Sequence, residues 1–191
     1  MSEVGLPAEL RPTLPPWARV GTARLRHIQR VAELVARWST DMGVPDSERN
    51  RWLRAVWLHD ALRDATPAEL EELAPSMGGS PELRHGPASA ARAKAEGERD
   101  QGVLDAVRYH SVGLAEWDMV GRVLYCADFL EPGRPQHGPE RAALAADFPA
   151  HPERVLHDVA KLRLLHLIQS DWSIPQTTWR FWNELAHSSA R

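Results

Sequence analysis

The stretch RWLRAVWLHD, residues 51–60, places a histidine and an aspartate at the end of a hydrophobic helical pattern. Residues three, four and seven apart share one face of a helix, so His59 lies in line with Trp52 and Asp60 lies in line with Val56. Burying even an uncharged polar group without a partner costs roughly 2–7 kcal/mol. The stretch therefore predicts a buried helix end at which His59 and Asp60 meet a partner that satisfies them.

Four further residues of the same two types stand in comparable places. His27, His110 and Asp128 each lie on the apolar face of a predicted helix. His85 directly precedes a Gly-Pro pair, and because proline is well placed in the first turn of a helix, we expect His85 at the mouth of a helix over 87–96. Any one of these histidines could equally be a hydrogen-bonded core residue, but the ordered series predicts a metal site.

The chain has 191 residues, of which 43% are hydrophobic, and this is enough to bury one substantial core. Residues 1–16 contain four prolines and no periodicity, so we expect an extended leader followed by one domain over 17–191. Helical periodicity follows, and no alternating strand pattern competes with it. Thr66-Pro67 with Glu69 is a clear signal for the start of a helix. Helices are expected near 17–39, 47–61, 67–74, 87–96, 100–111, 116–130, 138–146, 151–170 and 175–188.

These elements predict an all-α fold, a single-domain helical bundle with a buried metal site. Ligands from at least four helices would converge on one interior point, which is a common way for such bundles to bind metal. The eight tryptophans, among them Trp52, Trp57, Trp179 and Trp182, are expected to fill the bundle rather than to stack on a base.

Composition also restricts the location and the partners. The apolar runs fall well below the length of about 20 residues that a bilayer span requires, and no secretory signal pattern is present, so we expect a cytoplasmic protein without membrane contact. Cys126 is the single cysteine, which excludes an internal disulfide, and we expect it to be a small core residue. The net charge of −3 argues against nucleic acid as a partner but leaves a small anionic substrate open.

The ligand types indicate the metal chemistry. Imidazole and carboxylate without a cysteine ligand suit iron, manganese, zinc or cobalt, and suit a structural zinc poorly. Six candidate ligands are too many for one structural ion and are the right number for two ions with a bridging carboxylate. Two cations roughly 3.5–4 Å apart are a recurring arrangement for the hydrolysis of phosphate esters and anhydrides.

The site residues and their surroundings resemble a known family. The set His27, His59, Asp60 and Asp128 resembles the H…HD…D signature of the HD superfamily of metal-dependent phosphohydrolases, and His85 and His110 are similar to the extra ligands of its dinuclear members. The segment ADFLEPGR, residues 127–134, resembles the AD-x-(I/L)-EP-x-R motif of the YqeK-type bacterial symmetrical bis(5'-nucleosyl)-tetraphosphatases. The resemblance covers roughly residues 20 to 188.

The resemblance implies an HD-type domain that binds two divalent metal ions. Iron is the first expectation, and manganese, cobalt or zinc are the alternatives. One ion would be held by His27, His59, Asp60 and Asp128, and the other by His85 and His110, with Asp60 bridging. A metal-bound hydroxide would attack an inner phosphorus of diadenosine tetraphosphate, a small dinucleoside polyphosphate, and release two ADP. Arg134, just beyond the helix that carries Asp128, is a candidate phosphate contact.

One position departs from the family pattern. Where a lysine is expected three residues after the HD aspartate, the chain has Arg63. Arginine keeps the charge but does not lose a proton, so Arg63 would support catalysis by binding phosphate and would not act as a general acid. Alternatively, Arg63 and Asp64 pair with each other or with solvent at a helix end.

Two other functions remain open at this point. The same metal site would serve a nucleotidase or phosphodiesterase acting on another nucleotide. The domain could also be a catalytically silent module that senses a nucleotide, although the intact ligand set argues against this. The sequence leaves a monomer and a homodimer both open.

Overall fold

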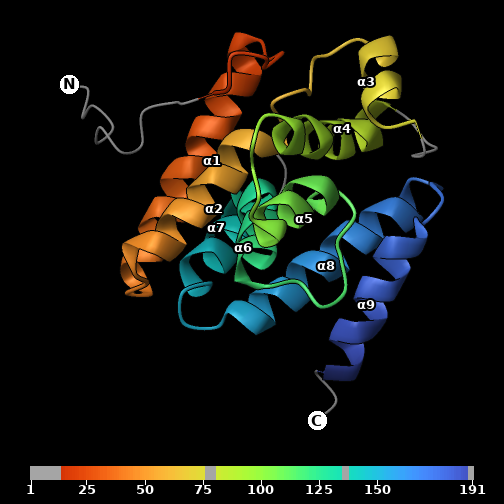
Figure 1. Cartoon of the computed structure of the whole chain (residues 1–191). Helices are drawn as coiled ribbons and strands as arrows, with labels where there is room; N and C mark the ends of the chain where they lie inside the picture. Colours follow the sequence, from red (N-terminus) through yellow and green to blue (C-terminus); the bar gives the residue numbers. More distant parts are fainter. Residues whose placement is uncertain (1–13, 76–80, 135–137, 189–191) are drawn as a thin grey trace.

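The computed structural model describes residues 14–75, 81–134 and 138–188 (Figure 1). Within these ranges the chain forms helices and no strand, which confirms the predicted all-α class. Most of the expected leader lies outside the described residues. The elements are α1 Thr22–Asp41, α2 Asp46–His59, α3 Pro67–Leu73, α4 Pro81–Ala95, α5 Gln101–Tyr109, α6 Met119–Leu130, α7 Gly138–Asp147, α8 Pro152–Gln169 and α9 Gln176–Ser188.

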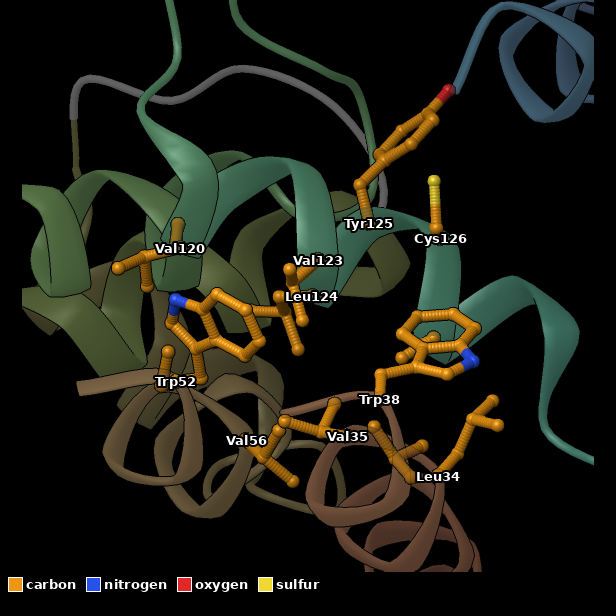
Figure 2. Packing of buried hydrophobic residues seen from close by; sticks show 14 of the residues in the cluster. Leu34, Val35, Trp38, Trp52, Val56, Val120, Val123, Leu124, Tyr125 and Cys126 are labelled. Atoms are coloured by element: carbon orange, nitrogen blue, oxygen red, sulfur yellow. The ribbon is translucent and has the colours of Figure 1, made fainter. Parts of the chain in front are cut away.

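Helix α6 is the central element of the bundle and contacts α1, α2, α5, α7 and α8. Nine of its twelve residues are buried, because its sequence is apolar on nearly every side. Figure 2 shows Trp52 of α2 beside Leu124 of this helix and Trp38 of α1 near Cys126. Burial of Asp128 therefore follows from its place on a helix that the fold encloses.

The residues that were expected in the core are buried with one exception among those described below. Trp52, Trp57 and Cys126 are buried, as expected. The prediction is wrong for Trp179, whose exposed fraction is 56%. Helix α9 turns the side of Phe181 toward the core, and a residue two positions away points in the other direction.

The local start signal at α3 is confirmed, because Thr66 and Glu69 form a reciprocal capping box. Helix α1, in contrast, begins at Thr22 and not at residue 17. The preceding segment instead pairs its backbone with the turn after α2. There the amide of Arg19 donates to the carbonyl of Ala61 (2.6 Å), and the amide of Asp64 donates to the carbonyl of Arg19 (3.0 Å).

Helix α4 begins earlier than expected, at Pro81, and Pro87 lies inside it. His85 is therefore within the helix and not at its mouth, which corrects the expectation from the sequence. A proline disfavours helical geometry in the residue before it by clashing with that residue's backbone and Cβ. Gly86 has no Cβ, which lessens this clash and lets the helix continue through the proline.

Gly86 also sets the separation of α4 and α5. A Cβ at this position would lie 2.9 Å from the carbonyl oxygen of Val107 and 3.1 Å from Cε1 of His110. Because the nearest of these atoms belongs to the backbone, a larger residue would push apart the two helices that carry His85 and His110.

No helix in the described ranges is both long and apolar enough to cross a membrane.

We expect Gly86→Ala to lower the free energy of unfolding by about 1–3 kcal/mol, because the added methyl overpacks the α4–α5 contact. Gly138→Ala is the matched control, since a Cβ there meets nothing within 4 Å. The control should change the free energy by less than about 0.5 kcal/mol. Urea unfolding of both variants measures the difference, and equal stabilities would show that the contact has room for a methyl group.

Candidate metal centre

Five helices bring the six predicted ligand residues to one place. His27 comes from α1, and His59 and Asp60 come from the C-terminal end of α2. His85 comes from α4, His110 caps the end of α5, and Asp128 comes from α6. No side chain in this set is more than 10% exposed, so the structure confirms that polar groups gather inside the bundle.

The carboxylate of Asp60 stands between two groups of histidines. Its Oδ2 lies 3.7 Å from Nε2 of His27 and 3.5 Å from Nε2 of His59. Its Oδ1 lies 3.0 Å from Nε2 of His85 and 3.7 Å from Nε2 of His110. Each group, together with Asp60, brings its ligand atoms within 4.8 Å of one another. The two oxygens of this one carboxylate therefore face different histidine groups.

Hydrogen bonds fix the orientation of two of the rings. Nδ1 of His59 lies 2.7 Å from the carbonyl oxygen of Val56, and Nδ1 of His110 lies 2.8 Å from that of Val107. A carbonyl oxygen can only accept, so Nδ1 carries the hydrogen in both rings. In the neutral ring Nε2 then presents a lone pair, which is the form in which histidine binds a metal.

The polar atoms at the centre fit a divalent cation. Nε2 of His59 is buried without a hydrogen-bond partner among the described residues, and Nε2 of His27 lies 3.1 Å from Oδ1 of Asp128. Leaving such a nitrogen unsatisfied costs about 1–3 kcal/mol. Nitrogen and carboxylate donors without thiolate suit divalent transition metals. The two groups could therefore hold metal ions, with His27 and His59 on one side of Asp60 and His85 and His110 on the other.

The charge states of Asp60 and His110 agree with this arrangement. Burial raises the pKa of Asp60, but the His59 and His85 rings outweigh it and hold this pKa well below its usual range. Burial and the neighbouring His85 ring lower the pKa of His110 to about 3. Asp60 is therefore ionised and His110 is neutral at physiological pH, which are the forms that coordinate a cation.

Glu131 supports the site from behind His27, a role that the sequence interpretation missed. Its Oε1 lies 3.1 Å from Nδ1 of His27, and its Oε2 accepts from Arg30 and from the amide of Gly133. Burial raises the pKa of Glu131, but the contacts with His27 and Arg30 outweigh burial and lower it to about 2. A signal was present, because Glu131 belongs to the quoted ADFLEPGR segment and follows Asp128 by three residues.

Two arginines hold the carboxylate of Asp128. Arg134 donates to its Oδ1 (2.7 Å), and Arg163 donates to its Oδ2 (2.8 Å). Arg134, the candidate phosphate contact, is thus engaged by Asp128 in this structure. Arg163 was not anticipated, because it belongs to α8, which carries no recognisable motif, and it stacks over Tyr125 with its guanidinium carbon 4.3 Å from the ring centre.

A cavity of about 1340 Å³ opens over the site. Asp60, His85, His110 and Asp128 contribute to its lining, so the cavity reaches both histidine groups. Five arginines also line it: Arg24, Arg63, Arg134, Arg141 and Arg163. The carboxylate of Asp64 accepts from the amide of Gly21 (2.7 Å), and no ion pair joins it to Arg63 among the described residues. The cavity is larger than the roughly 300–1,000 Å³ of typical small-ligand pockets.

We expect Glu131→Gln to weaken divalent-metal binding about 10- to 100-fold, because the change removes the charge that orients His27. Glu153→Gln is the matched control, since Glu153 is 64% exposed and pairs with Arg122 away from the site. Competition against a fluorescent chelator gives both affinities. The role of Glu131 would be disproved by equal affinities for the two variants.

Comparison with known proteins agrees with the geometry. The HD domain family model matches residues 24–147, a range that contains all six candidate ligands. A symmetrical bis(5'-nucleosyl)-tetraphosphatase of Staphylococcus aureus is 30% identical over 111 residues, covering 58% of this chain and 57% of that protein. A protein of the same name from Bacillus subtilis is 37% identical over 73 residues, covering 38% and 36%. These matches span less than two thirds of the relatives' own length.

A crystal structure provides an independent comparison of the fold. It is that of a predicted HD superfamily hydrolase involved in NAD metabolism from Clostridium acetobutylicum. It superposes with a TM-score of 0.76 at 21% identity, covering 88% of this chain and 92% of the other. The fold, the buried histidine and aspartate residues and the family match over more than half of the sequence lead to one conclusion: the chain belongs to the HD domain family of hydrolases.

Proposed function

We propose that this protein hydrolyses diadenosine tetraphosphate symmetrically to two ADP. The observation that carries the proposal is the Asp60 carboxylate, which turns one oxygen toward each of two buried histidine groups beside an arginine-lined cavity. This arrangement suits two cations, and two-metal sites serve phosphate hydrolysis. Relatives named symmetrical bis(5'-nucleosyl)-tetraphosphatase support this choice of substrate.

We assign His27, His59, Asp60 and Asp128 to one divalent ion, and His85 and His110, with Asp60 shared, to the other. Iron is the first candidate, and manganese, cobalt or zinc would suit the same donors. When bound, such ions lower the pKa of water and neutralise charge on phosphate oxygens. The side chains have a further task, since Asp60 stays ionised and the Nδ1 bonds of His59 and His110 keep their Nε2 atoms directed inward.

Arg63 is the proposed phosphate contact on the Asp60 side of the cavity. It lines the cavity, and its guanidinium has no ion-pair partner among the residues that the structure describes. An unpaired guanidinium can donate two parallel hydrogen bonds to a phosphate. In the reaction, water attacks one inner phosphorus, the bond from that phosphorus to the oxygen that joins the two inner phosphorus atoms breaks, and a proton accompanies the departing ADP.

Asp60→Asn should reduce kcat/KM for diadenosine tetraphosphate at least about 10³-fold, because losing the shared carboxylate forfeits several kcal/mol of transition-state stabilisation. The bound metal, measured by elemental analysis, should fall as well. Asp64→Asn is the matched control, since Asp64 is exposed and its carboxylate accepts a hydrogen bond from the backbone amide of Gly21. Full metal content and activity in Asp60→Asn would contradict the proposal.

The products of the metal-loaded protein test the symmetry of cleavage. With ferrous iron under reducing conditions, diadenosine tetraphosphate should give ADP alone, and in ¹⁸O-labelled water one of each two ADP molecules should carry one labelled oxygen. AMP with ATP would contradict symmetrical cleavage. Nucleotide binding without turnover would instead favour the sensing module.

A further inference from the structure

Arg141, on α7, has a different environment from most arginines of the cavity. Its Nη1 donates to the carbonyl oxygen of Phe129 (2.9 Å), and its guanidinium carbon lies 4.1 Å from the centre of the Phe129 ring. Its Nε is buried without a hydrogen-bond partner. Among the described residues no carboxylate lies within ion-pair distance of it. A partly buried cation is thus held only by a backbone carbonyl and an aromatic ring.

The neighbouring arginines show the contrast. Arg24 pairs with Asp60 at 2.8 Å, and Arg134 and Arg163 each pair with Asp128 at 2.7 and 2.8 Å. Arg141 lines the same cavity and remains without a counterion on the Asp128 side. The pairing of its neighbours leaves no carboxylate there to neutralise it.

The charged groups around Asp128 and Glu131 also leave an excess of positive charge. The carboxylates of Asp128 and Glu131 are surrounded by four arginines, namely Arg30, Arg134, Arg141 and Arg163. This excess of two positive charges stands within a chain whose net charge is −3. Burial and repulsion from Arg134 and Arg163 lower the pKa of Arg141. An anion in the cavity would relieve this repulsion, and any bound metal ion would add to the attraction.

We propose that Arg141 binds a phosphate group of the polyphosphate chain on the Asp128 side of the cavity. The proposal rests on the proposed function for the identity of the anion. A guanidinium suits this task because its planar fork matches two phosphate oxygens, while the Phe129 ring holds its plane in position. Arg63 and Arg141 would then contact the chain from the Asp60 and Asp128 sides of the site.

Arg141→Met tests the proposal, because methionine keeps much of the aliphatic length and removes the charge. KM for diadenosine tetraphosphate should rise about 10- to 100-fold, with kcat changed less than about threefold, because a charged hydrogen bond is lost. Tripolyphosphate should bind the metal-loaded protein more weakly by a similar factor in calorimetry. Arg37→Met is the control, since Arg37 is exposed on α1. The metal content of both variants should equal that of the parent.

Equal KM and equal tripolyphosphate affinity in Arg141→Met and Arg37→Met would overturn the proposal. A lower Tm with unchanged affinity would do so too, since a purely structural role predicts that pattern. If Arg141→Met does not fold, Arg141→Lys replaces it: lysine keeps the charge without the fork and should lose part of the affinity, while full affinity would overturn bidentate binding. Should the parent not hydrolyse the dinucleotide yet bind tripolyphosphate through Arg141, the proposed function would fail and this inference would stand.

Discussion

The carboxylate of Asp60 is the constraint on which the rest of the site depends. It is buried and ionised, and its two oxygens face different pairs of histidines. A buried charge of this kind is tolerated only when it is paired and hydrogen-bonded. The five helices that supply its neighbours therefore have to meet at this point. Their meeting depends on the close packing of α4 on α5 at Gly86 and on the packing of α6 in the core.

The charged groups around Asp60 fall into two regions, the candidate metal centre and the cavity above it. At the candidate metal centre, carboxylates and imidazoles could supply donors for cations, and Glu131 contacts His27 from outside that set. Around the cavity, arginines exceed the carboxylates available to pair with them, and Arg141 has none in the described part of the chain. A protein with a net negative charge thereby presents a positive cavity, and this distribution favours a small, highly charged anion as ligand.

The sequence predicted the helical class and the gathering of the six candidate ligand residues, because all of them except His85 end or continue an apolar face within their own helices. Features that depend on packing between distant segments were not predictable in this way. Arg163 meets Asp128 from a helix 35 residues further along, and nothing in its local pattern distinguishes it from a surface arginine. The start of α4 was misplaced because Pro87 gives the signal of a first turn, whereas the preceding glycine allows the helix to pass through it.

Anomalous diffraction at the metal absorption edge, on crystals of the protein purified with ferrous iron under anaerobic conditions, tests the central claim most directly. Two anomalous peaks are expected roughly 3.5–4 Å apart, one beside His27 and His59 and the other beside His85 and His110, with Asp60 between them. A single peak on one side of Asp60, or metal bound elsewhere in the protein, would contradict it.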